Sequence, residues 1–332
     1  MKNNAAYIET CAAGERAGLF YTCINSFLTA EEMAYIVTNS ESKVLITSLS
    51  KLALVQAAIK DCPTLEQILV VDSESLPLER VDGPAFSDYH TVISQYSGAP
   101  IQDESLGTSM LYSSGTTGLP KGVIITHGMM VWAQINASSM HCNSDMVGLT
   151  VMPLFHIGGL QVFTCPALFF GGTAIIMRTF DPGAALDAFS NPELGITHFL
   201  GVPAIFNALR DHPKNRDATF DSLRVCIAGA EAVPAALVNW WYERGVVIQE
   251  GYGMTENMAS CCILGYDDVP ARVGSAGKAL RHTEIKIVRE DGGEAAPGEA
   301  GELWCRGPVV TPGYWRRPDA NAETFVDGWL RT

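Results

Sequence analysis

Apolar, β-branched runs alternate with segments of helical periodicity along most of the chain. The runs that predict strands lie at residues 43–47, 67–71, 148–152, 173–177, 197–200 and 223–228. Helices are expected at residues 49–60, 203–209 and 234–244, and the last two carry a proline near the first turn. Such alternation is typical of α/β proteins, in which helices pack on the faces of a sheet. We therefore predict an α/β fold with helix-flanked β-sheets.

The pattern changes near Ser275, where short strands and tight turns replace the helices. Strand candidates at residues 284–288 and 302–305 flank an Asp291-Gly-Gly turn and a Pro297-Gly-Glu turn. Such spacing is typical of antiparallel hairpins and indicates a small β-barrel or sandwich.

These patterns predict two structural parts and one irregular insertion. An α/β core is expected over residues 1–274 and a small β-subdomain over residues 275–332. The stretch 72–96 is polar and lacks periodicity, so we expect a loop-rich insertion there. With 332 residues, of which 47% are hydrophobic, the chain can bury a large core and form two packed units.

Charge and hydropathy exclude two classes of protein. The net charge of −14 argues against a nucleic-acid-binding surface, because phosphate backbones are bound by clustered Lys and Arg. The longest apolar run, residues 162–177, is interrupted by proline and glycine and is shorter than the ~20 residues of a membrane span. No signal peptide is expected at the N-terminus. Peripheral contact between an apolar substrate entrance and a membrane stays open.

The nine cysteines form neither a metal motif nor a disulfide framework. Cys261 and Cys262 are adjacent, the others are scattered, and no C-x-x-C spacing occurs. Reduced thiols fit the cytoplasm best. We therefore expect a cytoplasmic protein.

A loop rich in glycine and hydroxyl groups follows an apolar, strand-like stretch in the segment Met110-Leu-Tyr-Ser-Ser-Gly-Thr-Thr-Gly-Leu-Pro-Lys-Gly122. Glycines let backbone N–H groups approach an anion closely, hydroxyls add donors, and Lys121 adds a positive charge. The candidate phosphate-binding residues before the lysine are Ser113, Ser114, Gly115, Thr116, Thr117 and Gly118. This composition predicts a site for a nucleoside triphosphate, although most Ser/Thr/Gly clusters are surface loops.

The loop differs from the Walker P-loop. In G-x-x-x-x-G-K-[ST] a glycine precedes the lysine and a metal-binding hydroxyl follows it. Here Pro120 precedes Lys121 and Gly122 follows it. The ligand for a metal ion must therefore come from another part of the chain.

A second motif, Gln249-Glu-Gly-Tyr-Gly-Met-Thr-Glu256, supplies the missing groups. Tyr252 offers a ring face for a base, Thr255 a hydroxyl for a phosphate, and Glu256 a hard oxygen for Mg²⁺. Gly251 and Gly253 flank the tyrosine. Together the two motifs resemble the adenylate-forming superfamily of AMP-binding enzymes, and within it the fatty acyl-CoA synthetase (long-chain-fatty-acid–CoA ligase) branch.

The resemblance implies a fold and a reaction. The fold is the large N-terminal domain of acyl-CoA synthetases, with helix-flanked sheets followed by a small distorted β-barrel. The reaction uses ATP and Mg²⁺ to convert a carboxylic acid to acyl-AMP with release of pyrophosphate, and CoA then takes the acyl group as a thioester. Lys121 would hold the β- and γ-phosphates, Mg²⁺ on Glu256 would bridge phosphates, and Thr255 would orient the α-phosphate.

His156 lies in Met152-Pro-Leu-Phe-His-Ile-Gly-Gly159, directly after a predicted strand. The resemblance places it beside the substrate carboxylate as a positioning or gating residue. Without the resemblance, a structural role is the more common one for a single histidine at a strand end. General-base chemistry is not expected, because a carboxylic acid is already ionised near neutral pH.

The substrate is expected to be an uncharged acyl group, a fatty acid in the first place and an aryl acid as the alternative. Amino-acid-activating relatives have an aspartate where this chain has His156. Apolar residues expected near the acid are Phe155, Ile157, Leu160, Phe163, Phe199, Val202 and Ile205. About half of them are expected to serve only in core packing.

The segment Gly229-Ala230-Glu231 matches a family segment that flanks the adenine and the acyl group. Many relatives carry a small residue where Glu231 stands, so its role stays open between an adenine contact and a carboxylate at a helix start. Two further segments, residues 301–307 and 313–315, resemble a structural motif and receive no chemical role.

Both ends of the chain look cut when compared with the family. The first residues resemble the middle of a helix, and relatives continue after Thr332 with a ribose-binding aspartate and a domain that carries a second catalytic lysine. We therefore expect this chain alone to be a poor catalyst, and the alternative is a module that binds ATP or acyl-adenylate without turnover. The sequence indicates small-molecule partners and leaves a homo-oligomer open.

Overall fold

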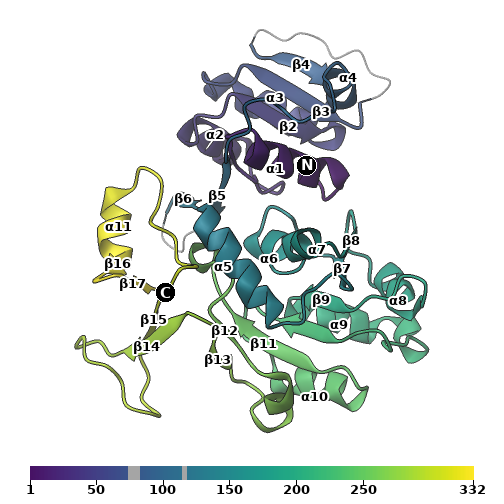
Figure 1. Cartoon of the computed structure of the whole chain (residues 1–332), viewed down its shortest axis with the longest axis vertical. Coiled ribbons are helices and arrows are strands. Elements are labelled where there is room, and N and C mark those ends of the chain that lie inside the picture. The colour runs from purple at the N-terminus through teal and green to yellow at the C-terminus, as the bar shows by residue number, and fades with distance from the viewer. Residues whose placement is uncertain (74–82, 114–117) are drawn as a thin grey trace. The chain divides into compact units, whose positions relative to one another are not determined.

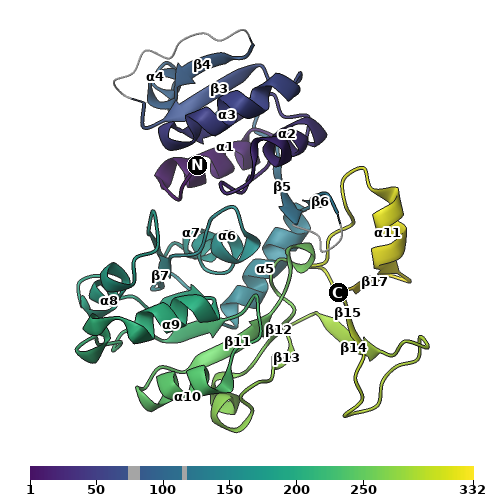
Figure 2. The ribbon, with the colours of Figure 1, turned by 180° about the vertical axis from the view of Figure 1, so that it is seen from behind.

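The computed structural model describes residues 1–73, 83–113 and 118–332 and divides into two compact units, Met1–Gly122 and Val123–Thr332. Figures 1 and 2 show the ribbon from opposite sides. The elements of the first unit are α1 (Ala5–Arg16), β1 (Phe20–Tyr21), α2 (Ala30–Asn39), β2 (Val44–Ser48), α3 (Leu52–Ala58), β3 (Gln67–Val71), β4 (Ala85–Asp88), α4 (Tyr89–Ile93) and β5 (Thr108–Ser113). Strand β6 (Lys121–Ile124) crosses the boundary.

Helices cover both faces of the parallel sheet β2-β3-β4 in the first unit. Val55 of α3 and Ile68 of β3 belong to one apolar cluster, and Leu69 of β3 and Tyr89 of α4 belong to another. Neighbouring residues of β3 therefore point to opposite faces, as the two-residue period of a strand requires. The strands predicted at 43–47 and 67–71 are confirmed, whereas the helix predicted at 49–60 is α3 with a 3₁₀ turn at each end.

The prediction of an irregular insertion at 72–96 is wrong for residues 85–93. Strand β4 pairs in parallel with β3, and α4 follows it directly. Asp88 begins this helix, since its Oδ1 accepts a hydrogen bond of 2.7 Å from the Thr91 N–H. The polar residues that suggested a loop include this helix cap. Residues 74–82 lie outside the described part of the chain.

The second unit is built around a mixed sheet of order β13-β12-β11-β10-β9-β7-β8. Strands β7 to β11 run parallel, and β12 and β13 are antiparallel additions at one edge. Its elements are α5 (His127–Ser138), β7 (Val147–Thr150), α6 (Ile157–Gln161), α7 (Thr164–Phe170), β8 (Thr173–Ile176), α8 (Pro182–Ser190), β9 (His198–Gly201), α9 (Pro203–Asp211), β10 (Val225–Ala228), α10 (Ala235–Glu243), β11 (Ile248–Tyr252), β12 (Cys262–Ile263) and β13 (Lys278–Ala279).

Two apolar clusters hold helices against the two faces of this sheet. On one face, Phe199 of β9 packs in the same cluster as Phe206 of α9 and Trp241 of α10. On the other face, Ile227 of β10 packs in a cluster with Ala137 of α5 and Phe163. Figure 1 shows α9 and α10 on one side of the sheet and α5 and α7 on the other. The predicted α/β class with helix-flanked sheets is confirmed.

The C-terminal stretch forms an antiparallel sheet of order β14-β15-β17-β16. Its elements are β14 (Glu284–Val288), β15 (Glu302–Arg306), α11 (Pro318–Thr324), β16 (Phe325–Val326) and β17 (Trp329–Arg331). The change to hairpins is confirmed, and the domain boundary at 275 stays a prediction. Among the described residues, no helix has the length and apolar character that a membrane crossing requires.

Candidate active site

The predicted site segments of the second unit follow the carboxyl ends of adjacent parallel strands. The loop after β7 carries His156, Val202 follows β9, Gly229 follows β10, and Gly253 follows β11. These strands are neighbours in the order β11-β10-β9-β7. In open α/β sheets, ligands bind in the crevice outside the carboxyl ends of the strands. The fold therefore gathers motifs that are far apart in the sequence at one edge of the sheet.

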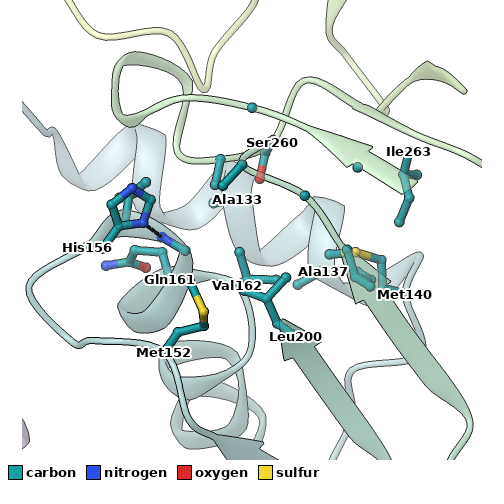
Figure 3. A pocket seen from close by; sticks show the side chains of 18 of the residues that line it. Ala133, Ala137, Met140, Met152, His156, Gln161, Val162, Leu200, Ser260 and Ile263 are labelled. Carbon is teal, nitrogen blue, oxygen red and sulfur yellow. Dashed lines mark hydrogen bonds between the residues drawn. The ribbon is translucent and has the colours of Figure 1, made fainter. Parts of the chain in front are cut away.

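An open cavity lies at these strand ends. Figure 3 shows side chains that line it. The lining residues are Ala133, Ala137, Met140, Met152, His156, Ile157, Gly158, Gln161, Val162, Leu200, Gly201, Val202, Ile227, Gly229, Ala230, Gly251, Gly253, Ala259, Ser260, Cys262, Ile263 and Leu280. No aspartate, glutamate, lysine or arginine occurs among these described lining residues. The cavity therefore suits an uncharged group.

His156 stands at the entrance to α6, and its ring orientation is fixed by the backbone. Its Nδ1 accepts a hydrogen bond of 3.1 Å from the Gly158 N–H. In the neutral ring the proton is then on Nε2, which leaves an N–H donor. Burial lowers the pKa of His156, although the ring stays open to the cavity. His156 is therefore a neutral hydrogen-bond donor at the cavity wall.

Backbone strain marks the loops that form the cavity wall. Ala230, Met258 and Ala259 have φ angles of 69°, 58° and 54°, in a region that side chains rarely adopt. Ala230 and Ala259 line the cavity. Gly253 has no room for a side chain, because a Cβ atom there would lie 2.3 Å from the Ala259 carbonyl carbon. Strain of this kind is often found at functional sites.

Glu256 is buried, with 3% of its surface exposed, and one of its oxygens is held by a tyrosine. The hydroxyl of Tyr314 donates a hydrogen bond of 2.8 Å to Glu256 Oε1. Burial and the neighbouring carboxylate raise the pKa of Tyr314, so the tyrosine keeps the proton that it donates. Tyr314 belongs to the segment 313–315 that received no chemical role from the sequence.

The backbone that follows the phosphate loop is joined to the same tyrosine. Val123 forms a β-bridge with Tyr314, and the Ile124 N–H donates a hydrogen bond of 3.1 Å to the Gly313 carbonyl. The Thr311 hydroxyl donates a hydrogen bond of 2.6 Å to the Ile124 carbonyl. The Thr311 N–H donates another, of 2.8 Å, to the Glu256 carbonyl. Hydrogen bonds therefore connect the strand after Gly122 with the segment that carries Glu256.

The phosphate loop itself is only partly described. Ser113 ends β5, and its buried Oγ has no hydrogen-bond partner among the described residues. Gly118 is exposed, and Lys121 begins β6 after Pro120, whose carbonyl accepts a hydrogen bond of 3.2 Å from the Tyr35 hydroxyl. Ser114, Gly115, Thr116 and Thr117 lie outside the described residues. The phosphate contacts of this loop stay predictions.

The remaining predicted residues lie around the end of β11. Gly251 lines the cavity, and Tyr252 is half-buried, with a pKa raised by burial. Thr255 opens the short 3₁₀ turn that leads to Glu256. Glu231 is exposed and precedes α10, which begins at Ala235.

The predicted acyl-pocket residues divide between the cavity and the core. Ile157 and Val202 line the cavity. Phe163 and Phe199 are buried in the apolar clusters, and Leu160 is fully buried. Ile205 packs against the core, and Phe155 is half-buried.

Sequence reasoning missed several cavity residues, among them Gln161, Met140 and the alanines of α5. Gln161 is 3% exposed, and neither atom of its amide has a hydrogen-bond partner within the described structure. Its place on the short helix that starts after His156 was a usable signal. No comparable signal existed for Met140, because it lies beyond α5 and far from every motif in sequence.

Comparison with known proteins settles the family. The sequence profile described as "AMP-binding enzyme" matches residues 1–315. The chain belongs to the AMP-binding enzyme family. The resemblance seen in the two loop motifs is thereby confirmed at the level of the superfamily.

Curated members of the family are similar over nearly the whole chain. A feruloyl-CoA synthase of Amycolatopsis sp is 33% identical over 331 residues, which cover 99% of this chain and 63% of that protein. An indoleacetate–CoA ligase of Aromatoleum aromaticum is 31% identical over 335 residues, which cover 99% of this chain and 64% of that protein. The chain thus spans a little under two thirds of the length of these relatives.

Solved structures agree with the fold. The anthranilate CoA ligase AuaEII in complex with anthranoyl-AMP superposes with a TM-score of 0.90 at 25% identity, covering 100% of this chain and 64% of that one. The fatty acyl-CoA branch is a finer assignment than the family match supports.

Proposed function

We propose that this chain forms the adenylating site of an acid–CoA ligase, which converts a carboxylic acid and ATP to acyl-AMP and pyrophosphate before CoA takes the acyl group. The observation that carries the proposal is the apolar cavity at the strand ends, with the neutral donor His156 in its wall. An uncharged acyl group fits this cavity, and the family match supports the nucleotide chemistry.

The preferred acid in this proposal is aromatic. Small residues of α5, Ala133 and Ala137, and of the strand ends, Gly229 and Gly251, form much of the cavity wall and leave room for a flat ring. The feruloyl, indoleacetate and anthranilate ligases that resemble the chain are named for aromatic acids. A fatty acid, which the sequence motifs favoured, becomes the competing substrate class.

The carboxylate end of the acid is proposed to lie at His156. The Nε2–H of the neutral ring would donate to one carboxylate oxygen and orient the other toward the α-phosphorus of ATP. That oxygen forms the new P–O bond while the bond to pyrophosphate breaks, and pyrophosphate leaves with the electron pair. Because the acid arrives ionised, no proton has to be removed, and catalysis depends on positioning and on charge neutralisation.

The residues present fit a magnesium ion that arrives with the triphosphate. Mg²⁺ is commonly bound by one or two carboxylates together with substrate phosphates, and Glu256 is a buried carboxylate whose orientation Tyr314 fixes. Glu256 would hold the ion, which when bound neutralises phosphate charge. Lys121 and the hydroxyls of its loop would hold the β- and γ-phosphates, and Thr255 the α-phosphate.

An exchange assay tests the proposal. The protein is incubated with ATP, Mg²⁺, labelled pyrophosphate and single acids from an aromatic and a fatty series, and label in ATP is measured. Slow but measurable exchange that depends on aromatic acids is expected, and fatty acids should support less of it. Exchange with fatty acids alone would overturn the aromatic preference. ATP binding without exchange for any acid would favour the alternative of a nucleotide-binding module.

A further inference from the structure

Met140 is one of the residues that line the cavity. Figure 3 shows His156 and Met140 at opposite ends of the labelled lining residues, with Val162 and Leu200 between them and Ile263 beside Met140. Met140 is partly buried against the apolar cluster that contains Ile227. An acid whose carboxylate lies at His156 would therefore point its far end toward the Met140 side chain.

A tight turn after α5 places this methionine. The Met140 N–H donates 2.9 Å to the carbonyl of Ala137, and the Cys142 N–H donates 3.3 Å to the same carbonyl. His141 between them has a φ of 57°. The helix thus ends at Ser138, and Met140 in the turn lines the cavity.

A buried histidine on β9 fixes the position of this turn. The Nε2 of His198 lies 3.1 Å from the Met140 carbonyl oxygen, which can only accept, so Nε2 carries the proton. Its Nδ1 lies 2.7 Å from the Thr197 hydroxyl, which in turn accepts 2.8 Å from the Val147 N–H. A continuous hydrogen-bonded path thus runs from β7 through β9 to the Met140 backbone.

His198 is held rigidly in this path. It is 1% exposed, and its ring makes an edge contact with Phe163 at a centroid distance of 5.1 Å. Burial lowers the pKa of His198 to about 4, so the ring is neutral at physiological pH and keeps one tautomer. Since both ring nitrogens have partners, the ring has little freedom to turn.

We propose that Met140 determines the longest acid that the cavity accepts, and that His198 is a positioning residue that holds Met140 in place. The inference rests on the proposed function, because it takes the carboxylate end of the acid to lie at His156. Methionine is flexible, so this end wall adapts to small differences in the acid while still blocking a long one.

The test compares acids of increasing length: benzoic acid, cinnamic acid and 4-phenylcinnamic acid. For each acid the Kd is measured by calorimetry without nucleotide, and kcat/KM by pyrophosphate exchange. In Met140→Ala, the ratio of kcat/KM for 4-phenylcinnamic acid to kcat/KM for benzoic acid should be about tenfold higher than in wild type, since the shortened side chain lengthens the cavity. In Met140→Trp, the same ratio should be about tenfold lower than in wild type.

Met146→Ala is the matched control. Met146 is 1% exposed and belongs to the same apolar cluster, yet it does not line the cavity. This variant should lose stability in a thermal melt and keep the wild-type order of acids. If Met140→Ala and Met146→Ala changed the order of preferred acids in the same way, loosened packing, and not cavity length, would set the preference.

His198→Gln and His198→Leu test the positioning role. Glutamine can still donate to the Met140 carbonyl, so its order of acids should stay close to wild type. Leucine removes the hydrogen bond. The ratio of kcat/KM for the longest acid to that for the shortest should then rise by about fivefold, and the KM for ATP should stay unchanged. Equal preferences in the two variants would overturn the role of His198.

The outcomes separate the inference from the function beneath it. If the wild type binds and activates aromatic acids and Met140→Ala leaves their order unchanged, the inference is overturned while the proposed function stands. If no acid binds to the wild type and none supports exchange, the proposed function fails and the inference with it.

Discussion

The two ends of the cavity are built in different ways. At the His156 end, the histidine that caps α6 and the glycine that orients its ring are two residues apart in the chain. At the Met140 end, the methionine is positioned by His198, which is 58 residues away in the chain. Local sequence builds the end proposed for chemistry, whereas long-range contacts build the end proposed for size selection. Substitutions at the first end should therefore change rates, and those at the second should change preferences.

The largest effect is expected from Glu256→Gln, which keeps the side-chain shape and removes the charge proposed to hold magnesium. Pyrophosphate exchange should fall by about a thousandfold for every acid. Tyr314→Phe, which removes only the hydrogen bond to the carboxylate, should reduce pyrophosphate exchange by about tenfold. Full exchange by Glu256→Gln would exclude the proposed role of this carboxylate.

Buried His198 should make stability depend on pH. Its folded pKa of about 4 is below the ordinary value near 6.5, so below pH 6.5 the unfolded chain binds a proton that the folded chain does not. This stability is therefore present above pH 6.5 and is lost as the pH falls toward 4, by about 3 kcal/mol in total. Urea melts between pH 7 and 4 should show a smaller loss for His198→Gln than for wild type. Equal losses would contradict the buried neutral ring.

His156→Ala should reduce kcat/KM in the exchange assay by about 10- to 100-fold, which is the value of one hydrogen bond to a charged group. The reduction should be similar for short and long acids, unlike that of the Met140 variants. Because burial lowers the pKa of His156, wild-type exchange should begin to decline at a lower pH than a histidine of ordinary pKa would give. A length-dependent loss would remove the distinction between the two ends.

The smallest effect is expected at Gln161. Its buried amide has no partner in the described structure, so Gln161→Leu should raise the free energy of unfolding by about 1 kcal/mol. In the control Gln249→Leu, stability should fall, because the Gln249 amide donates 2.8 Å to the Leu264 carbonyl. Unfolding in denaturant measures both. A marked loss of exchange in Gln161→Leu would instead make this amide a substrate contact.

The sequence predicted much of the second unit because its strands and motifs are local signals. Strands such as 284–288 were correct to the residue, and the motifs around His156 and Gly229 lie at the strand ends where the cavity forms. The stretch 85–93 was missed, since a polar helix cap and a short strand look like loop residues until β3 pairs with them.

The family and the candidate chemical groups were determined by the sequence alone, because loops that bind phosphates and metal ions need particular residues at fixed spacing. The partners of those groups and the limits of the cavity were decided only by the tertiary structure. Tyr314 reaches Glu256 and His198 reaches Met140 across 58 residues in each case. Such contacts follow from the packing of strands and helices against one another. The periodicity of the sequence does not predict which distant side chains this packing brings into contact.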